Sequence, residues 1–261
     1  MKIFVLGNDS RSIFLKEMYS KNDLITEDIY SSDFIITAIP FTKDNKYVNT
    51  TNLLISDLVS VLEEKKIKLI SGSIPLNIIY DLTIKNIEFF DVLRNEEVAI
   101  KNAIPTAEGA ILSALSNSNI TLNSSNILIM GFGKIGKILA NMLRGFGANI
   151  YIEARKESDL AFIKAYGYKA VDLKELNDYL YRFDFIFNTI PYVLLDEKRL
   201  RLLKNQILII DVASSPGGVD YKKAKELDIN VDWALALPTK VAPKTAANYL
   251  KESIDKIIFN K

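Results

Sequence analysis

Short apolar runs separated by amphipathic stretches make up most of this chain. In the first half, the runs are rich in Ile and Phe and cover residues 2–7, 33–40, 67–73 and 87–93. Each run closes on Gly, Pro or a polar cluster, which is typical of buried parallel strands. The residues between them, 10–20 and 52–66, carry apolar positions at helical spacing.

The second half repeats this pattern at greater length. Six apolar runs cover residues 126–133, 149–154, 168–171, 184–191, 206–212 and 229–237, with helical stretches between them. Strict alternation of strand and helix predicts a parallel sheet with helices on both faces. We therefore expect an α/β fold with two doubly wound parallel-sheet domains.

Two nearly identical octapeptides link the halves. "DFIITAIP" covers residues 33–40 and "DFIFNTIP" covers residues 184–191. The neighbouring segments also correspond, so the halves are interpreted as variations on one α/β unit, the first with two strands fewer. Ligands of such sheets bind at the carboxyl ends of the strands. We expect the two domains to face each other, with residues 37–41 near residues 188–192 across one cleft.

A polar stretch over residues 117–126 is the expected boundary between the domains. Before it, a helix is predicted over residues 106–118, opened by Pro105 and Thr106, with Glu108 in its first turn. We expect a substrate-side domain over residues 1–118 and a dinucleotide-binding domain over residues 119–242. The final helix, residues 243–261, is expected to pack back onto the first domain.

Composition narrows the class of protein. Of 261 residues, 33 are basic and 32 are acidic, so the net charge is +1 and no basic stripe predicts nucleic-acid binding. The chain has no cysteine, which fits a reducing compartment. No apolar stretch reaches the ~20 residues of a membrane span. The sequence begins directly with a strand-like run, without room for a signal peptide. A cytoplasmic protein is expected.

The chain contains no histidine. The most frequent general acid/base and the most frequent metal ligand are therefore both missing. Proton transfer must use Asp, Glu, Lys, Tyr or water, and no metal site is expected because Cys and His are the usual zinc ligands.

The strongest motif is "GFGKIG", which follows a predicted strand and opens a predicted helix. A G-x-G-x-x-G sequence in this context predicts a Rossmann dinucleotide-binding turn. Gly131 allows the tight turn, Gly133 lets the backbone approach a pyrophosphate, and Gly136 lets the helix pack on the sheet. The helix amides bind the anion. The predicted cofactor-binding residues here are Gly131, Phe132, Gly133, Lys134, Ile135 and Gly136.

The end of the second strand of this domain bears on the choice of cofactor. An NAD enzyme usually places Asp or Glu there for the ribose hydroxyl. The corresponding residue is Ala154, followed by Arg155 and Lys156, which favours the 2′-phosphate of NADP. Glu153 should point to the opposite face; a register shift of one residue would make it a ribose ligand and reverse the choice. Alternatively, these charges are merely solvated.

Two further segments are expected where a nicotinamide would extend. The first supplies Asn188, Thr189, Ile190 and Pro191, and the second supplies Asp211, Val212, Ser214 and Ser215. The sequence "PGG" at residues 216–218 is interpreted either as a simple turn or as a place where substrate approaches the backbone.

Charged and polar residues elsewhere could bind an anionic substrate. Arg11 follows a strand end and could hold a carboxylate with two hydrogen bonds, with Asp9 beside it. Thr106 is expected at a helix start, and Lys240 precedes the final helix. The alternatives are an Asp9 helix cap with a surface arginine, and a surface lysine at Lys240.

Together, "GNDSR", "KNAIPTAEGAI", "GFGKIG", "ARK", "NTIP", "DVASSPGGVD" and "LPTKVAPKTAANYL" resemble the family of the dipicolinate synthase A subunit. The resemblance runs from residue 3 to about residue 250. "NAIPTAEGAI" and "KVAPKTA" are its distinctive segments, whereas "GFGKIG" occurs in many dehydrogenases. The chain departs from the usual glycine of the family at Thr239 and Ala247, which affects the expected backbone near Lys240.

The resemblance implies the last step of dipicolinate synthesis in spore-forming bacteria. A hydroxy-tetrahydrodipicolinate, or its dehydrated dihydro form, would be oxidised by NADP to pyridine-2,6-dicarboxylate. A flavoprotein-like B subunit is the implied partner, and the mother-cell cytoplasm is the implied location. For the dicarboxylate substrate the candidate anion ligands are Arg11, Lys240 and the helix start at Thr106. The candidate bases are Asp9, Glu108, Asp211 and Lys240.

Other interpretations remain open at this point. A 2-hydroxyacid or alanine dehydrogenase-like enzyme would share two domains, but such enzymes generally use a histidine. A shikimate dehydrogenase-like enzyme fits "NTIP" and "ARK". A non-catalytic subunit that senses NADP would lack Arg11 and Lys240 in its cleft. Assembly into a homo-oligomer is left open.

Overall fold

The computed structural model describes residues 1–259 and divides the chain into two compact units. The first unit comprises residues 1–102 and the chain from Ala242 onward, and the second comprises Ala103–Val241. The last two residues of the expected 243–261 segment lie outside the described residues. Each unit contains one parallel sheet, which confirms the predicted fold class.

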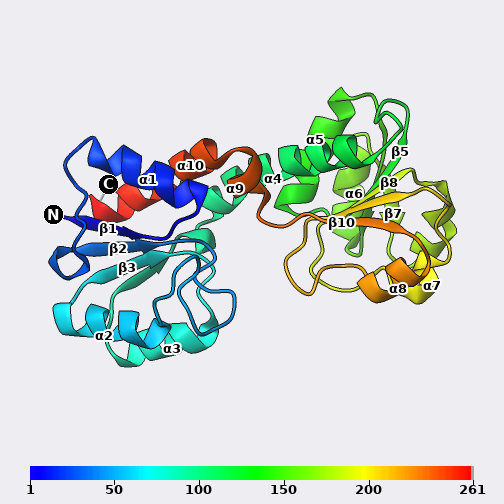
Figure 1. Cartoon of the computed structure of the whole chain (residues 1–261). Helices are drawn as coiled ribbons and strands as arrows, with labels where there is room; N and C mark the ends of the chain where they lie inside the picture. Colours follow the sequence, from blue (N-terminus) through cyan, green and yellow to red (C-terminus); the bar gives the residue numbers. More distant parts are fainter. Residues whose placement is uncertain (260–261) are drawn as a thin grey trace. The chain divides into compact units, whose positions relative to one another are not determined.

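The sheet of the first unit has four parallel strands in the order β1-β2-β3-β4. They are β1 (Ile3–Leu6), β2 (Phe34–Thr37), β3 (Lys68–Ser71) and β4 (Phe89–Asp91). Helices α1 (Ser10–Ser20) and α10 (Pro243–Ile258) lie on one face, and α2 (Ile55–Lys65) and α3 (Leu76–Ile84) lie on the other (Figure 1). Two single 3-10 turns, η1 (Ile29–Ser31) and η2 (Val92–Arg94), connect elements.

The final helix α10 belongs to the first unit. Its apolar residues Leu250, Ile254 and Ile258 join the cluster that includes Leu15 and Tyr19 of α1. The Tyr19 hydroxyl donates to Asp255 Oδ1 at 2.9 Å. Burial of this apolar stripe is the main force that brings the chain back to the first unit after Val241.

The second unit has six parallel strands in the order β10-β9-β8-β5-β6-β7. They are β5 (Asn126–Met130), β6 (Asn149–Ala154), β7 (Lys169–Asp172), β8 (Phe185–Asn188), β9 (Leu208–Asp211) and β10 (Asn230–Trp233). All ten strands of the two sheets fall within the apolar runs of the sequence, except that β7 extends one residue beyond its run. The strand order reverses at β5, between β6 and β8, as in dinucleotide-binding folds.

Helices cover both faces of the six-stranded sheet. One core cluster joins the sheet to α4 (Glu96–Asn117), α5 (Lys134–Gly145) and α6 (Glu157–Ala165). The other joins it to η3 (Leu176–Asp178), η4 (Leu180–Arg182), α7 (Glu197–Leu200) and α8 (Tyr221–Glu226). The short helix α9 (Leu237–Val241) follows β10.

The prediction of a helix start at Thr106 is wrong. Helix α4 begins ten residues earlier, at Glu96, and contains Pro105. The Asn95 side chain caps it by accepting hydrogen bonds from the N–H groups of Glu97 and Val98. Proline lacks the N–H of an interior helical residue, yet packing of the surrounding turns outweighs this loss. The backbone around Thr106 is therefore helix interior, and it offers no helix N-terminus to an anion.

The division between the units lies within α4, at residues 102/103, rather than in the polar stretch after residue 118. Ala107, Ala110, Ile111 and Ala114 pack in the core of the second unit. A helix face that is buried against this sheet belongs to its unit, although the polar composition changes only after the helix ends.

The repeated octapeptide occupies the same position in both sheets. In each, the aspartate before the strand accepts a hydrogen bond from a residue at the start of the neighbouring strand: Lys2 N donates to Asp33 Oδ2 at 2.6 Å, and Asn126 N donates to Asp184 Oδ2 at 2.8 Å. The return bonds, Asp33 N to Lys2 O and Asp184 N to Asn126 O, are also equivalent. The repeat therefore fixes the register of β2 against β1 and of β8 against β5. That the two segments face each other across a cleft stays a prediction.

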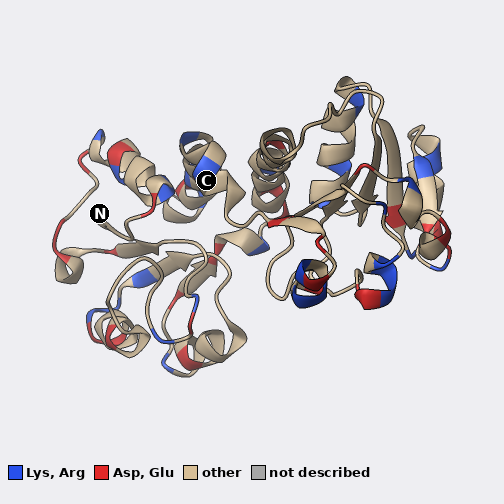
Figure 2. Ribbon diagram, turned by 45° about the vertical axis from the view of Figure 1, so that its right-hand side comes forward, with Lys and Arg blue, Asp and Glu red and all other residues tan. Residues whose placement is uncertain are grey.

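Charges of both signs are interspersed on the helices of each unit (Figure 2). Within residues 1–259, no helix is long and apolar enough to cross a membrane.

Candidate functional site

The glycines of the turn between β5 and α5 allow other groups to come close to its backbone. Gly131 has φ +94°, and a Cβ there would lie 2.7 Å from Thr189 Oγ1. A Cβ on Gly136 would lie 2.1 Å from the carbonyl oxygen of Gly131. A Cβ on Gly133, by contrast, would meet nothing within 4 Å. Two glycines are thus required by packing, whereas the middle one leaves open space above the turn.

The first turn of α5 borders that open space. Gly133 occupies the N-cap position and has no side chain with which to cap the helix. The amides of the first helical turn carry partial positive charge, and they suit a phosphate group. Phe132 is buried, Ile135 is half-buried, and Lys134 is exposed at the helix start. The residues present therefore fit the pyrophosphate of a dinucleotide.

The end of β6 lies next to this turn. Ala154 is buried in the core on the α5 side of the sheet, and Arg155 and Lys156 are exposed directly after it. The register pairs Glu153 with Met130 of β5 and with Val171 of β7. Since strand side chains alternate, Glu153 points away from Ala154, toward the face that carries α7. The alternative in which Glu153 occupies the ribose position is not what the structure shows.

Glu153 is the most unusual ionisable group of this unit. Its side chain is 2% exposed, and Oε2 has no hydrogen-bond partner among residues 1–259. Burial raises the pKa of Glu153 from 4.5 to about 7, although a hydrogen bond from Gly131 and the charge of Arg199 oppose the shift. A carboxyl group directly below the glycine turn therefore changes its charge near neutral pH.

The segments after β8 and β9 are held by side-chain hydrogen bonds. Thr189 Oγ1 donates to the carbonyl oxygen of Met130 at 2.8 Å, which ties the segment to the glycine turn. Asn188, fully buried, donates to Ile190 O at 3.0 Å and to Asp211 Oδ1 at 2.8 Å. Ile190 is half-buried and Pro191 is exposed beside them, and Val212 is buried after β9.

Asp211 does not have the surroundings of a general base. Its carboxylate is fully buried and accepts four hydrogen bonds, from Asn188, from the N–H groups of Ala213 and Gly218, and from the Tyr221 hydroxyl. A carboxylate with all its acceptor sites used holds the backbone and has no position left for a substrate proton. Asp211, one of the four candidate bases, therefore has a structural role in this fold.

In the first unit, Arg11 is nearly buried, at 5% exposure. Its Nη2 donates to the carbonyl oxygen of Ile39 at 2.6 Å, and no ion pair joins it to a carboxylate among residues 1–259. Burial lowers the pKa of Arg11, and the charge of Asp9 opposes this. Asp9 caps α1 by accepting from the N–H groups of Arg11 and Ser12. The cap predicted as an alternative is present, but the arginine beside it is not a surface residue.

The remaining candidates are Thr106, Glu108 and Lys240. Thr106 is buried in the interior of α4, and Glu108 is exposed two residues later on the same helix. Lys240 is exposed on α9.

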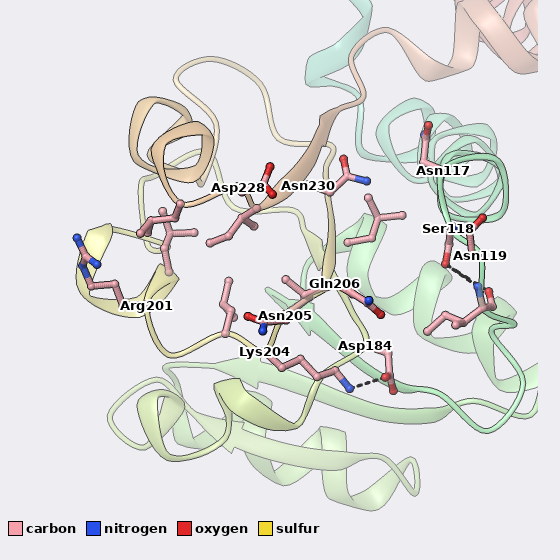
Figure 3. Close-up of a pocket in the computed structure, with 17 residues that line it drawn as sticks. Asn117, Ser118, Asn119, Asp184, Arg201, Lys204, Asn205, Gln206, Asp228 and Asn230 are labelled. Atoms are coloured by element: carbon pink, nitrogen blue, oxygen red, sulfur yellow. Dashed lines mark hydrogen bonds and ion pairs between the residues drawn. The ribbon is translucent and has the colours of Figure 1, made fainter.

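A large hollow of about 810 Å³ lies elsewhere on the second unit, at the opposite edge of the sheet (Figure 3). It is lined by residues at or before the starts of β8, β9 and β10, including Asp184, Gln206 and Asn230. Lys204 forms an ion pair with Asp184 across its floor (Figure 3). Because ligands of parallel sheets bind at the carboxyl edge, this hollow is not the candidate site.

Comparison with known proteins agrees with this geometry. Residues 93–219 match the family model "D-isomer specific 2-hydroxyacid dehydrogenase, NAD binding domain". The A subunit of dipicolinate synthase from Bacillus subtilis (strain 168) is 34% identical over 167 residues, which are 64% of this chain and 56% of that protein. The crystal structure of the dipicolinate synthase A subunit from Bacillus halodurans superimposes with a TM-score of 0.90 at 25% identity, over 98% of this chain and 97% of that one.

The chain is similar to the A subunits of dipicolinate synthase.

The matching NAD-binding domain and these similarities indicate an NAD(P)-dependent dehydrogenase with a nicotinamide cofactor. Escherichia coli D-lactate dehydrogenase shares the fold at a TM-score of 0.66 and 13% identity, over 100% of this chain and 98% of that one. Because the sequence alignment covers little more than half of the Bacillus subtilis protein, the activity of that protein is carried to this chain only as a proposal.

Sequence reasoning missed two residues of the site, Tyr221 and Trp233. They stack with ring centroids 4.6 Å apart, and Tyr221 reaches Asp211. They lie 10 and 22 positions after Asp211 on different elements, so no local spacing relates them. Glu153 was visible as a charged residue in a buried strand, but its unpaired oxygen is evident only in three dimensions.

The raised pKa of Glu153 predicts a pH-dependent stability. The folded protein retains a proton on this group that the unfolded chain releases between pH 4.5 and about 7. The free energy of unfolding should therefore fall as the pH rises through this range, by at most about 3 kcal/mol. Glu153→Gln removes the ionisable group, so it should be more stable than the wild type at about pH 8 and gain little at about pH 5.

Denaturant unfolding at both pH values measures this difference. Glu157→Gln, at an exposed position in the first turn of α6, removes the same charge and is the matched control. Equal effects of the two substitutions at about pH 8 would contradict the assigned pKa.

Proposed function

We propose that this protein is an NADP-dependent dehydrogenase that completes the synthesis of dipicolinate, pyridine-2,6-dicarboxylate. The observation that carries the proposal is the open glycine turn followed, at the end of β6, by Ala154 and two cations. Kinship with the A subunit of dipicolinate synthase supports the choice of substrate.

The proposed reaction balances with one nicotinamide cofactor and no other oxidant. The 4-hydroxy-tetrahydrodipicolinate precursor loses its hydroxyl group with a proton as water. The resulting dihydrodipicolinate then loses a hydride and a proton, and the ring becomes aromatic. When bound, NADP supplies the acceptor for that hydride.

The second unit supplies the groups that would bind NADP. The N-terminal turn of α5 would hold the pyrophosphate, and Gly133 leaves room for it. Arg155 and Lys156 would pair with the 2′-phosphate, where the small Ala154 gives no carboxylate to repel it. Glu153, on the other face, is not positioned to bind the ribose.

In the first unit, Arg11 is the candidate ligand for a substrate carboxylate. A buried guanidinium without a carboxylate partner is costly unless an anion joins it. The 2.6 Å bond to Ile39 O uses Nη2 and fixes the orientation of the guanidinium plane. Its other N–H groups would bind one carboxylate of the dianion.

Proton transfer in this proposal relies on few groups. Asp9 is engaged as a helix cap and Asp211 as a structural carboxylate. Glu108, Lys240 and water are the remaining candidates. The matching domain family is that of 2-hydroxyacid dehydrogenases, but the absence of histidine removes the acid/base residue on which such enzymes generally rely.

The partner and the location belong to the same proposal. A flavoprotein-like B subunit is the proposed partner, and the cytoplasm of the mother cell during sporulation is the proposed location. The choice of partner rests on kinship with a protein whose name describes it as one of the subunits of its enzyme.

A turnover assay tests the function directly. Freshly generated 4-hydroxy-tetrahydrodipicolinate is mixed with the protein and NADP, in the presence and in the absence of the B subunit. We expect NADPH absorbance and dipicolinate to appear in equal amounts. NADPH formation from D-2-hydroxyacids but not from this substrate would contradict the proposal.

The choice of cofactor is tested at Arg155. The wild type should bind NADP at least about tenfold tighter than NAD, a difference of about 1.4 kcal/mol. Arg155→Ala should remove most of this preference, and Lys164→Ala, an exposed cation at the end of α6, should leave it unchanged. Isothermal titration with both cofactors is the measurement, and equal wild-type affinities would refute the choice of NADP.

The role of Arg11 is tested by steady-state kinetics. Losing one partner of a buried charged contact costs ~2–5 kcal/mol, so Arg11→Ala should lower kcat/KM by roughly 30- to 4,000-fold. Arg11→Lys should restore only part of the loss because the planar fork is absent. NADP affinity should barely change in either variant.

The exposed Arg94 of the first unit provides the control substitution, Arg94→Ala. Thermal unfolding of each variant separates loss of folding from loss of binding. Near-normal kcat/KM in a folded Arg11→Ala variant, or joint loss of NADP and substrate binding, would show that Arg11 is not the anion ligand.

A further inference from the structure

The buried carboxylate of Asp211 binds both ends of the segment that follows β9. We propose that Asp211 is a positioning residue that, with Asn188 and Tyr221, holds residues 213–218 in the shape that receives the nicotinamide half of the cofactor. This inference rests on the proposed NADP site.

The Asp211 carboxylate accepts from main-chain N–H groups at both ends of the segment. Ala213 N donates to Oδ1 at 2.9 Å, and Gly218 N donates to Oδ2 at 2.7 Å. Hydrogen bonds to an ionised carboxylate in a buried site are about twice as strong as neutral ones. One side chain thereby binds both the start and the end of this loop.

Two aromatic residues also help to fix this segment. The Tyr221 hydroxyl donates to Asp211 Oδ2 at 2.7 Å, and its ring stacks on Trp233 at 22°. Trp233 Nε1 in turn donates to the carbonyl oxygen of Ala213 at 3.0 Å. Trp233 is the only tryptophan of the chain, and it is 37% exposed. Its fluorescence therefore reports on the surroundings of this loop.

The two glycines of the segment are required by the same network. Gly217 has φ +80°, and a Cβ there would lie 2.1 Å from the Tyr221 hydroxyl oxygen. A Cβ on Gly218 would lie 2.1 Å from Asn188 Nδ2. Both interpretations of "PGG" from the sequence overlooked this cause: the glycines make room for the side chains that bind Asp211.

The position of the network in the sheet relates it to the nicotinamide. A dinucleotide whose pyrophosphate lies at the β5 turn extends its adenosine half over β6, and its other half over the strands on the opposite side of β5. Those strands are β8 and β9. Asn188 at the end of β8 donates to both Asp211 and Ile190 O, so the network spans the ends of both strands.

The experiment compares a whole cofactor with its adenosine half. NADPH and adenosine 2′,5′-bisphosphate are titrated into the wild type, Asp211→Asn and Tyr221→Phe, and energy transfer from Trp233 to the bound dihydronicotinamide is recorded. The variants should bind NADPH about tenfold more weakly, the effect of losing one hydrogen bond to a charged group. Affinity for the bisphosphate should stay within about twofold of the wild type, and the energy transfer should decrease.

Two exposed positions of the second unit supply matched controls, Asp228→Asn and Tyr181→Phe, which should leave both affinities unchanged. Tyr221→Phe keeps the ring that stacks on Trp233, so it carries the test if Asp211→Asn does not fold.

Equal weakening of NADPH and the bisphosphate in a folded variant would overturn the inference, as would unchanged NADPH binding in both variants. Failure of the proposed function has a different signature: the wild type itself would then bind neither NADPH nor the bisphosphate, and the inference would fall with it.

Discussion

Each parallel strand of this protein ends in backbone N–H and C=O groups that turn away from the sheet, and these groups must be satisfied where they are buried. Short polar side chains at the strand ends do this. Thr189 binds the last carbonyl of β5, Asp211 binds the loop after β9, and Asp91 accepts from the N–H groups of Ser73 and Ile74. The same requirement therefore shapes the carboxyl edge of both sheets.

This constraint explains why several residues with the appearance of catalytic groups are structural. Asp9 and Asp211 are carboxylates at the carboxyl edge, where a ligand is expected, yet their oxygens are used by the backbone. The hydrogen bonds of these carboxylates hold the neighbouring loops in place. A site whose loops are fixed loses less conformational entropy when a ligand binds.

Two buried charges stand outside this pattern. Among the described residues, Arg11 forms no ion pair with a carboxylate, and one oxygen of Glu153 has no hydrogen-bond partner. Both burials cost stability, and strongly perturbed groups of this kind concentrate at functional sites. The proposed function assigns an anionic substrate to Arg11. Glu153 lies next to the glycine turn, and burial raises its pKa to about 7.

The sequence by itself determined the strands, the glycine turn and the exposed cations after Ala154, because period, turn chemistry and neighbours along the chain define them locally. It did not determine the start of α4, since tertiary packing allows Pro105 inside the helix. The burial of Arg11 and the hydrogen bonds of Asp211 with Tyr221 were also decided only by tertiary structure. These contacts join residues on different elements, and desolvation depends on every group that surrounds a side chain rather than on its neighbours in sequence.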